Sequence, residues 1–300
     1  MKPQFLSGIS LLLILMLSSC EKEVDFELGP SQDKVVVEGT IEVGLPPYIF
    51  LTQSLGFFGT VDLSTLSNSF LHGAHITVSD GERTFILREY EETQNNYSIY
   101  FYSVDTDDNN ALNFRGTVGK TYTLTIEYDG KTYSSETYIP PVKPLDSLWA
   151  MPAPEGSFPD SIENAMTLYA RYSDPDTAGN RSRYFIKQNN SRFLPPLYSV
   201  DEDVIVNGTT VDIQLLPGVD KMDSTSIGQF RYFETGDTVV VKWTAIDKGV
   251  FDFWRTLEFS YGATGNPFAS PVEITTNIKG GALGVWAGYN PSYDTLILEP

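Results

Sequence analysis

Runs in which apolar and polar residues alternate recur from residue 34 onward and predict β-strands along most of the chain. Residues 121–138 show the pattern most clearly, because two such runs flank Asp129 and Gly130. An Asp-Gly pair supplies the positive φ angles that a tight hairpin turn requires. About seven strands of this kind in the first half predict an antiparallel sandwich of the immunoglobulin or fibronectin type over residues 34–140.

The second half of the chain predicts further strands and one helix. Four large apolar or aromatic residues recur there at helical spacing, namely Phe251, Trp254, Leu257 and Tyr261. Asp247 can cap the start of this helix, and Gly262 can end it. After the helix, we expect strands at residues 272–276, 282–286 and 295–298.

A cluster of prolines separates the two halves. Three prolines fall within residues 140–144, and such a run favours an extended, semi-rigid connector. We expect a Pro-rich linker at residues 141–160 and a second β-rich domain at residues 161–300. The predicted fold class is therefore all-β, with two antiparallel β-sandwich domains and one short helix in the second.

The first nineteen residues have the pattern of a secretory signal peptide. Lys2 gives a basic start, and residues 9–17 form an apolar run well short of the roughly 20 residues that a membrane-spanning helix needs. Residues 17–20 (Leu-Ser-Ser-Cys) resemble a bacterial lipobox. We expect residues 1–19 to be removed and the Cys20 thiol to carry lipid, so that acyl chains attach the protein to a membrane. The alternative is an ordinary signal peptide with an incidental cysteine.

Composition narrows the classes of function. The chain has 300 residues, with 39 acidic and 20 basic side chains and a formal net charge of −19. That balance argues against a nucleic-acid partner, because phosphate neutralisation needs a basic surface. A single cysteine excludes an intramolecular disulfide framework and a cysteine-rich metal site.

Acidic residues follow the cysteine directly. Glu21, Glu23, Asp25 and Glu27 lie in a segment that we interpret as a solvated acidic tether over residues 20–33. The same segment resembles the surface-export signal of Bacteroidetes lipoproteins. That resemblance implies an outer-membrane location facing outward, and the periplasmic face is the alternative.

Taken together in their order and spacing, several segments resemble the DUF4249 family of Bacteroidetes lipoproteins, a domain family of unknown function. They are residues 20–25, 35–39, 73–81, 119–126, 139–141, 173–176 with Asn180, 266–268 and 277–281. One departure is the stretch Arg181-Ser-Arg-Tyr184, where the family pattern has an aromatic pair directly after Asn180. The resemblance implies an accessory of a TonB-dependent outer-membrane transporter, by association and not through any residue.

The histidines and acidic stretches that could serve in catalysis or metal binding are interpreted as structural residues. His72 and His75 differ in strand parity and so face opposite sides, which disfavours a shared metal. The acidic stretches 105–110 and 174–180 favour turns, and an irregular calcium site is the alternative for each. The sequence lacks the Gly-x-Ser-x-Gly motif of serine hydrolases. We expect no catalytic residue, no metal ligand and no cofactor.

Two aromatic features are candidate binding elements. Phe57 and Phe58 are adjacent in a glycine-flanked loop and are weak ligand-binding candidates, because an exposed apolar loop tip often binds a partner. Tyr97, Tyr100, Phe101 and Tyr102 belong to an aromatic strand, and one of its two faces could stack on a sugar or a protein. Sandwich core plus surface tyrosines is the favoured interpretation of that strand.

The leading functional hypothesis is a non-catalytic, lipid-anchored outer-membrane protein that holds or gates a substrate for a TonB-dependent transporter. A surface adhesin or scaffold that binds a glycan or a protein is the alternative. A hydrolase that uses a carboxylate pair is a third hypothesis, although with 39 acidic residues some pair will always be close.

Overall fold

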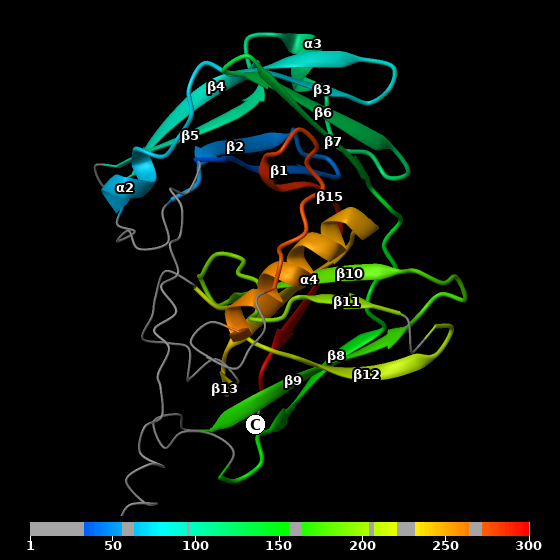
Figure 1. Cartoon of the computed structure of the whole chain (residues 1–300). Coiled ribbons are helices and arrows are strands. Elements are labelled where there is room, and N and C mark those ends of the chain that lie inside the picture. Colours follow the sequence, from blue (N-terminus) through cyan, green and yellow to red (C-terminus); the bar gives the residue numbers. More distant parts are fainter. Residues whose placement is uncertain are drawn as a thin grey trace, which may run out of the picture. The chain divides into compact units, whose positions relative to one another are not determined.

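The computed structural model describes residues 33–55, 63–94, 97–156, 164–203, 207–220, 232–263 and 272–299. Residues Asp33–Pro300 form one compact unit, whose described part is drawn in colour in Figure 1. Cys20, Phe57 and Phe58 therefore lie outside the described residues. Among the helices of the described part, none is long and apolar enough to cross a membrane.

The chain is all-β, as predicted, and most of its strands belong to one eleven-stranded sheet. In spatial order that sheet contains β11 (Val200–Glu202), β10 (Arg181–Gln188), β14 (Thr238–Ala245), β15 (Leu283–Ile297), β1 (Val35–Glu42), β2 (Tyr48–Gln53), β5 (Tyr97–Val104), β4 (Thr84–Gln94), β3 (His75–Ser79), β6 (Thr121–Tyr128) and β7 (Lys131–Tyr138). A smaller sheet contains β12 (Thr210–Leu215), β9 (Ala165–Ser173), β13 (Phe233–Glu234) and β8 (Ser147–Pro152). The helices of the described part are α2 (Leu63–Ser67), α3 (Asn109–Leu112) and α4 (Lys248–Ala263).

The first part of the large sheet folds over on itself and encloses a core. Figure 1 shows β1 and β2 facing β3, β6 and β7 across this core. Trp286 of β15 is fully buried in it and donates its Nε1–H to the carbonyl of Tyr122 at 2.9 Å. Gly39 faces the same ring, and a Cβ at that position would lie 2.7 Å from Trp286 Cε3. Glycine at position 39 therefore makes room for the largest side chain of the core.

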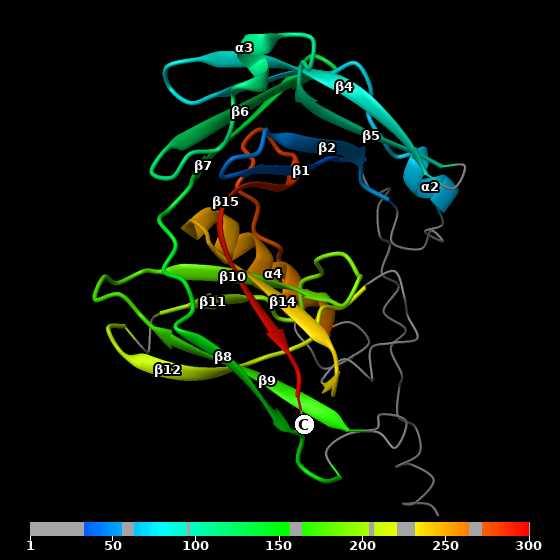
Figure 2. The ribbon, with the colours of Figure 1, turned by 180° about the vertical axis from the view of Figure 1, so that it is seen from behind.

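The second half is built in layers on both faces of β10 and β14. Leu168 and Ala170 of β9 pack with Val239 and Val241 of β14 in a second core. Helix α4 packs over the opposite face of the sheet, against β10, β11 and β15, and the view from behind in Figure 2 places β14 and β15 in front of it. The eleven-stranded sheet contains strands from both halves, and the domain boundary at the Pro-rich segment stays a prediction.

Strand β15 connects the two halves. Its first part, residues 283–289, pairs in parallel with β1, and residues 290–297 pair antiparallel with β14. It is buried on both faces, because Trp286 lies in the first core while Val285, Ala287 and Tyr289 lie under α4. The two separate strands expected at 282–286 and 295–298 are thus parts of one long strand.

The sequence predicted the central helix correctly. Helix α4 spans Lys248–Ala263, and Asp247 caps it, with Oδ1 accepting the backbone N–H of Val250 at 2.9 Å. The other oxygen, Oδ2, accepts from Thr137 Oγ1 at 2.6 Å and from the backbone N–H of Tyr138 at 2.9 Å. One carboxylate therefore fixes the start of α4 to the end of β7.

The strand expected at residues 272–276 is wrong, because the structure has irregular chain there. Side chains at the end of this segment, and not its backbone groups, form the hydrogen bonds to β15. The amide of Asn277 accepts from the N–H of Trp286 at 2.9 Å and donates to its carbonyl at 2.8 Å, while Thr276 Oγ1 donates to the carbonyl of Gly284 at 2.7 Å. Side chains that bond to backbone groups compete with strand pairing in this way.

Candidate functional site

A large apolar cavity lies between helix α4 and the face of the sheet formed by β1, β10 and β15. Its volume is about 860 Å³, which is within the range of about 300–1,000 Å³ typical of small-molecule sites. Phe253, Trp254 and Leu257 line it from α4, and Val36 and Val285 line it from the sheet. Irregular residues 272–276 form a further part of the wall.

The cavity exists because the face of β1 that points toward α4 is not covered by close packing. Alternate residues of β1 face opposite sides, so Val37 and Ile41 enter the first core while Val36, Glu38 and Thr40 line the cavity. Glu38 is exposed although β1 is a central strand with neighbours on both edges. A charged side chain can stay hydrated at such a position only where open space adjoins the sheet.

Arg183 of β10 is the most deeply buried charge of the cavity wall, at 3% exposure. Its Nε donates to Ser199 Oγ at 3.0 Å, and its Nη1 donates to the hydroxyl of Tyr289 at 2.9 Å. The guanidinium carbon lies 3.4 Å from the ring centroid of Trp254 and 4.6 Å from that of Phe185. Stacking on two aromatic rings stabilises the planar cation and fixes its orientation.

Glu258 of α4 offsets part of this buried charge. Its carboxylate is 2% exposed and accepts from the backbone N–H of Ser199 at 2.8 Å and from the Ser199 hydroxyl. Arg183 and Glu258 are therefore connected through one serine. A buried cation needs such compensation, because an isolated charge in the interior is strongly destabilising.

The hydroxyl of Tyr289 is the second polar group at this end of the cavity. It accepts from Arg183 Nη1 and, at 3.1 Å, from Trp254 Nε1. Burial raises the pKa of Tyr289 above its ordinary value of 10.0, which already leaves the hydroxyl protonated at neutral pH. Arg183, Trp254 and Tyr289 come from β10, α4 and β15, so this cluster forms only when all three elements are packed.

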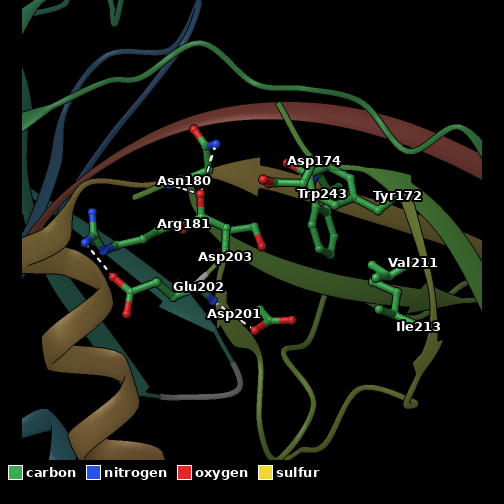
Figure 3. A pocket seen from close by; sticks show the side chains of 11 residues that line it. Tyr172, Asp174, Asn180, Arg181, Asp201, Glu202, Asp203, Val211, Ile213 and Trp243 are labelled. Carbon is green, nitrogen blue, oxygen red and sulfur yellow. Dashed lines mark hydrogen bonds and ion pairs between the residues drawn. The ribbon is translucent and has the colours of Figure 1, made fainter. Parts of the chain in front are cut away.

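A second, much smaller pocket lies beside β10 and is polar. Figure 3 shows Arg181, Asp174, Glu202 and Asp203 around it, and its volume of about 30 Å³ suits a water molecule but no organic ligand. Arg181 pairs with Glu202 at 2.5 Å, and Asp203 accepts the backbone N–H groups of Gly179 and Asn180 at 2.9 and 3.0 Å. These carboxylates hold the turn that precedes β10.

The acidic stretches of the sequence thus form turns. In the other stretch, Asp105 and Asp107 both accept from Arg88 Nη1, at 3.2 and 2.7 Å, and Asp108 caps α3. Among the described residues, no cluster of three or more histidine, cysteine, aspartate or glutamate side chains could hold a metal ion.

The two histidines have separate environments. His72 Nδ1 lies 2.5 Å from Glu89 Oε1, and its ring packs edge-on against Tyr100 at 4.5 Å between centroids. His75 begins β3 and is exposed. The structure does not bring the two rings together around a common site within its described part.

The aromatic strand β5 divides between core and surface. Tyr102 lies in the first core, whereas Phe101 packs with Tyr48 and Tyr90 on the outer face, both at 5.6 Å between centroids. Tyr97 and Tyr100 line an open groove of about 490 Å³ together with His72 and Phe70. Phe101 and Tyr102 thus face opposite sides, as neighbours in a strand do, whereas Tyr97 and Tyr100 differ in parity and still line the same groove.

Sequence reasoning missed Arg183, Tyr289 and Trp254 as a polar cluster. Trp254 was recognised only as a residue of the helix face. The available signal was the stretch Arg181-Ser-Arg-Tyr184, which places two arginines on alternate positions of a strand beside the aromatic residues Tyr184 and Phe185. A buried arginine is rare without a partner or a ligand, so an arginine inside a strand is a useful marker.

Fold and cavity together define an all-β protein with a ligand-sized apolar cavity beneath one helix. The family model described as "Domain of unknown function (DUF4249)" matches residues 21–294, and the chain belongs to this family. Among the curated proteins, none matches this chain.

Proposed function

We propose that this protein is a non-catalytic, lipid-anchored binding protein of the outer membrane that holds a ligand for a TonB-dependent transporter. The observation that carries the proposal is the cavity of about 860 Å³ under α4, with its predominantly apolar wall. Sites that bind small molecules combine such walls with a few fixed polar groups. The Arg183–Trp254–Tyr289 cluster supplies polar groups of this kind, held in place by one another.

A binding role fits the way in which the polar groups are fixed. Arg183 is stacked between aromatic rings and bonded to two hydroxyls, and Glu258 is buried against Ser199. Side chains fixed in this way can orient a ligand, whereas an acid–base catalyst must gain or lose a proton during the reaction. We therefore favour retention of a ligand over its chemical conversion.

Membrane attachment rests on the N-terminal sequence. Cys20 follows the lipobox-like segment, and acyl chains on its thiol would each stabilise membrane binding by about 0.8 kcal/mol per buried CH₂. The acidic residues 21–27 then place a hydrated spacer between the anchor and the folded unit. This arrangement would let the cavity face a neighbouring membrane protein.

Gentle detergent extraction followed by affinity purification of the tagged full-length protein tests the proposal. We expect a TonB-dependent barrel to co-purify, and we expect a small organic molecule in a solvent extract of the purified protein. The Cys20→Ser variant is the matched control, since it should lose the membrane anchor and keep the cavity. Recovery of the wild-type protein alone, with no barrel and no extractable ligand, would contradict the proposal.

A surface adhesin remains the second candidate because of the groove on β5. Tyr97, Tyr100 and His72 line this open groove next to the small polar residues Ser64 and Asn68. Exposed aromatic rings with neighbouring hydroxyl and amide groups suit a sugar ring. Glycan-array binding that Tyr100→Ala removes, without any transporter in the purified material, would favour this function.

A further inference from the structure

The polar end of the large cavity has more hydrogen-bond donors than acceptors. An arginine side chain has five N–H donors. Arg183 donates one to Ser199 Oγ and one to the hydroxyl of Tyr289, and these are the hydrogen bonds that its side chain forms with other described residues. Among the described residues, three N–H donors of this cavity-lining side chain therefore have no acceptor.

Tyr289 adds another donor at the same place. Its oxygen accepts from two N–H groups, those of Arg183 and Trp254, and both lone pairs are thereby occupied. The hydroxyl must direct its own hydrogen to another acceptor, and none of the described residues provides one. Tyr289 is only 4% exposed, and buried polar groups are rarely left without a partner.

The carboxylates near the polar end of the cavity do not accept these hydrogen bonds from Arg183 and Tyr289. Glu258 and Arg183 both form hydrogen bonds to Ser199, and none of the described hydrogen bonds joins the two side chains directly. Glu38 lines the same cavity from β1, but it is exposed, and no hydrogen bond of the described residues joins it to Arg183 or Tyr289. Glu273 and Lys34 also line the cavity and are likewise exposed. The salt bridges of the described residues include none that involves Arg183.

We propose that the cavity binds an amphipathic carboxylate, with its head group on Arg183 and Tyr289 and its apolar chain along α4. A carboxylate accepts two parallel N–H bonds from a guanidinium, so it matches the donors that remain on Arg183. It also supplies the negative charge that a neutral ester or alcohol would not. Phe253, Leu257 and Val36 continue the cavity with apolar wall, which suits an alkyl chain. The inference rests on the proposed function only in that the cavity holds a ligand.

The test compares two ligands of equal chain length, decanoate and decanol, by isothermal titration calorimetry. The protein is the mature chain from residue 20 carrying Cys20→Ser, which retains the whole folded unit in solution. We expect decanoate to bind at least about tenfold more tightly than decanol, since a charge-assisted hydrogen bond is worth about twice a neutral one. Tyr289→Phe should weaken decanoate binding about fivefold to tenfold and leave decanol binding unchanged.

Three further variants distinguish the contribution of head-group contacts to affinity from that of the apolar wall. Arg183→Lys keeps the positive charge and should retain part of the preference for decanoate, whereas Arg183→Met should remove the preference. Val36→Trp fills the apolar end and should abolish the binding of both ligands. The matched control is Tyr102→Phe, which removes a buried tyrosine hydroxyl from the first core and should change neither affinity.

The possible outcomes distinguish this inference from the proposed function. Equal affinities of decanoate and decanol for the wild-type protein would overturn the carboxylate assignment and leave the cavity as a ligand site. Absence of binding by either ligand, in protein shown by circular dichroism to be folded, would overturn the assignment and remove the main support for the proposed function. If Tyr289→Phe does not fold, the wild-type comparison and Arg183→Lys decide the question.

Discussion

Replacing Asp247 by alanine should disconnect helix α4 from the first half of the protein. The carboxylate caps the helix through Val250 and accepts hydrogen bonds from Thr137 and Tyr138 at the end of β7. Loss of an N-cap costs about 1 kcal/mol. Loss of an ionised acceptor for the buried Thr137 hydroxyl and the Tyr138 N–H adds about 1–2 kcal/mol. We therefore expect the free energy of unfolding to fall by about 2–3 kcal/mol.

Urea unfolding followed by circular dichroism measures this change, and Asp252→Ala is the matched control. Asp252 lies one turn further along α4 and pairs with Lys248 at 2.5 Å on an exposed surface, where an ion pair contributes at most about 0.5 kcal/mol. Asp247→Asn should fall between the two, because asparagine is also a good cap. Equal destabilisation by Asp247→Ala and Asp252→Ala would refute the connecting role of Asp247.

Three further predictions concern the backbone, pH and membrane attachment. Gly284→Ala should abolish folding, because φ is +106° and the new Cβ would lie 1.9 Å from a backbone oxygen of β1. Gly281 has φ +91° but open space around it, so Gly281→Ala should lower the free energy of unfolding by only about 1 kcal/mol in the same urea assay. Asp80 is partly desolvated, which favours the neutral acid, but hydrogen bonds from Arg83 outweigh this and lower the pKa of Asp80 to about 2. Its contribution to stability is complete above the ordinary value of 3.8 and is lost as pH falls toward 2, so Asp80→Asn should flatten the pH dependence of unfolding in that window. Mass spectrometry of the membrane fraction should find acyl chains on Cys20, and Cys20→Ser should move the protein into the soluble fraction.

Local patterns in the sequence predicted the elements whose contacts are local. The hairpin of β6 and β7 turns at Asp129 and Gly130, with φ of 48° and 70°, as the Asp-Gly pair indicates. Helix α4 was predicted from one apolar face and one cap, and both are properties of neighbouring residues. Information of this kind is complete within about twenty residues of chain.

Local sequence patterns do not predict which strands pair when they lie far apart in the chain. The parallel pair of β1 and β15 joins residues such as Val36 and Leu283, and no local pattern specifies a partner so far along the chain. The cavity depends on that pair, because its wall combines β1, β15 and α4. The Arg183 cluster was missed for the same reason, since Trp254 and Tyr289 reach it from two other elements.

The position of β15 also bears on when the protein can fold. This last strand of the chain lies between β1, the first strand described, and β14. Until it is inserted, the sheet remains in two separate pieces with open edges. Pairing of such distant segments slows folding, and unpaired edges favour aggregation. The emerging polypeptide must therefore be kept from premature association until its carboxyl end has been synthesised, and a stop codon that truncates β15 would be far more damaging than an equally short deletion in a surface loop.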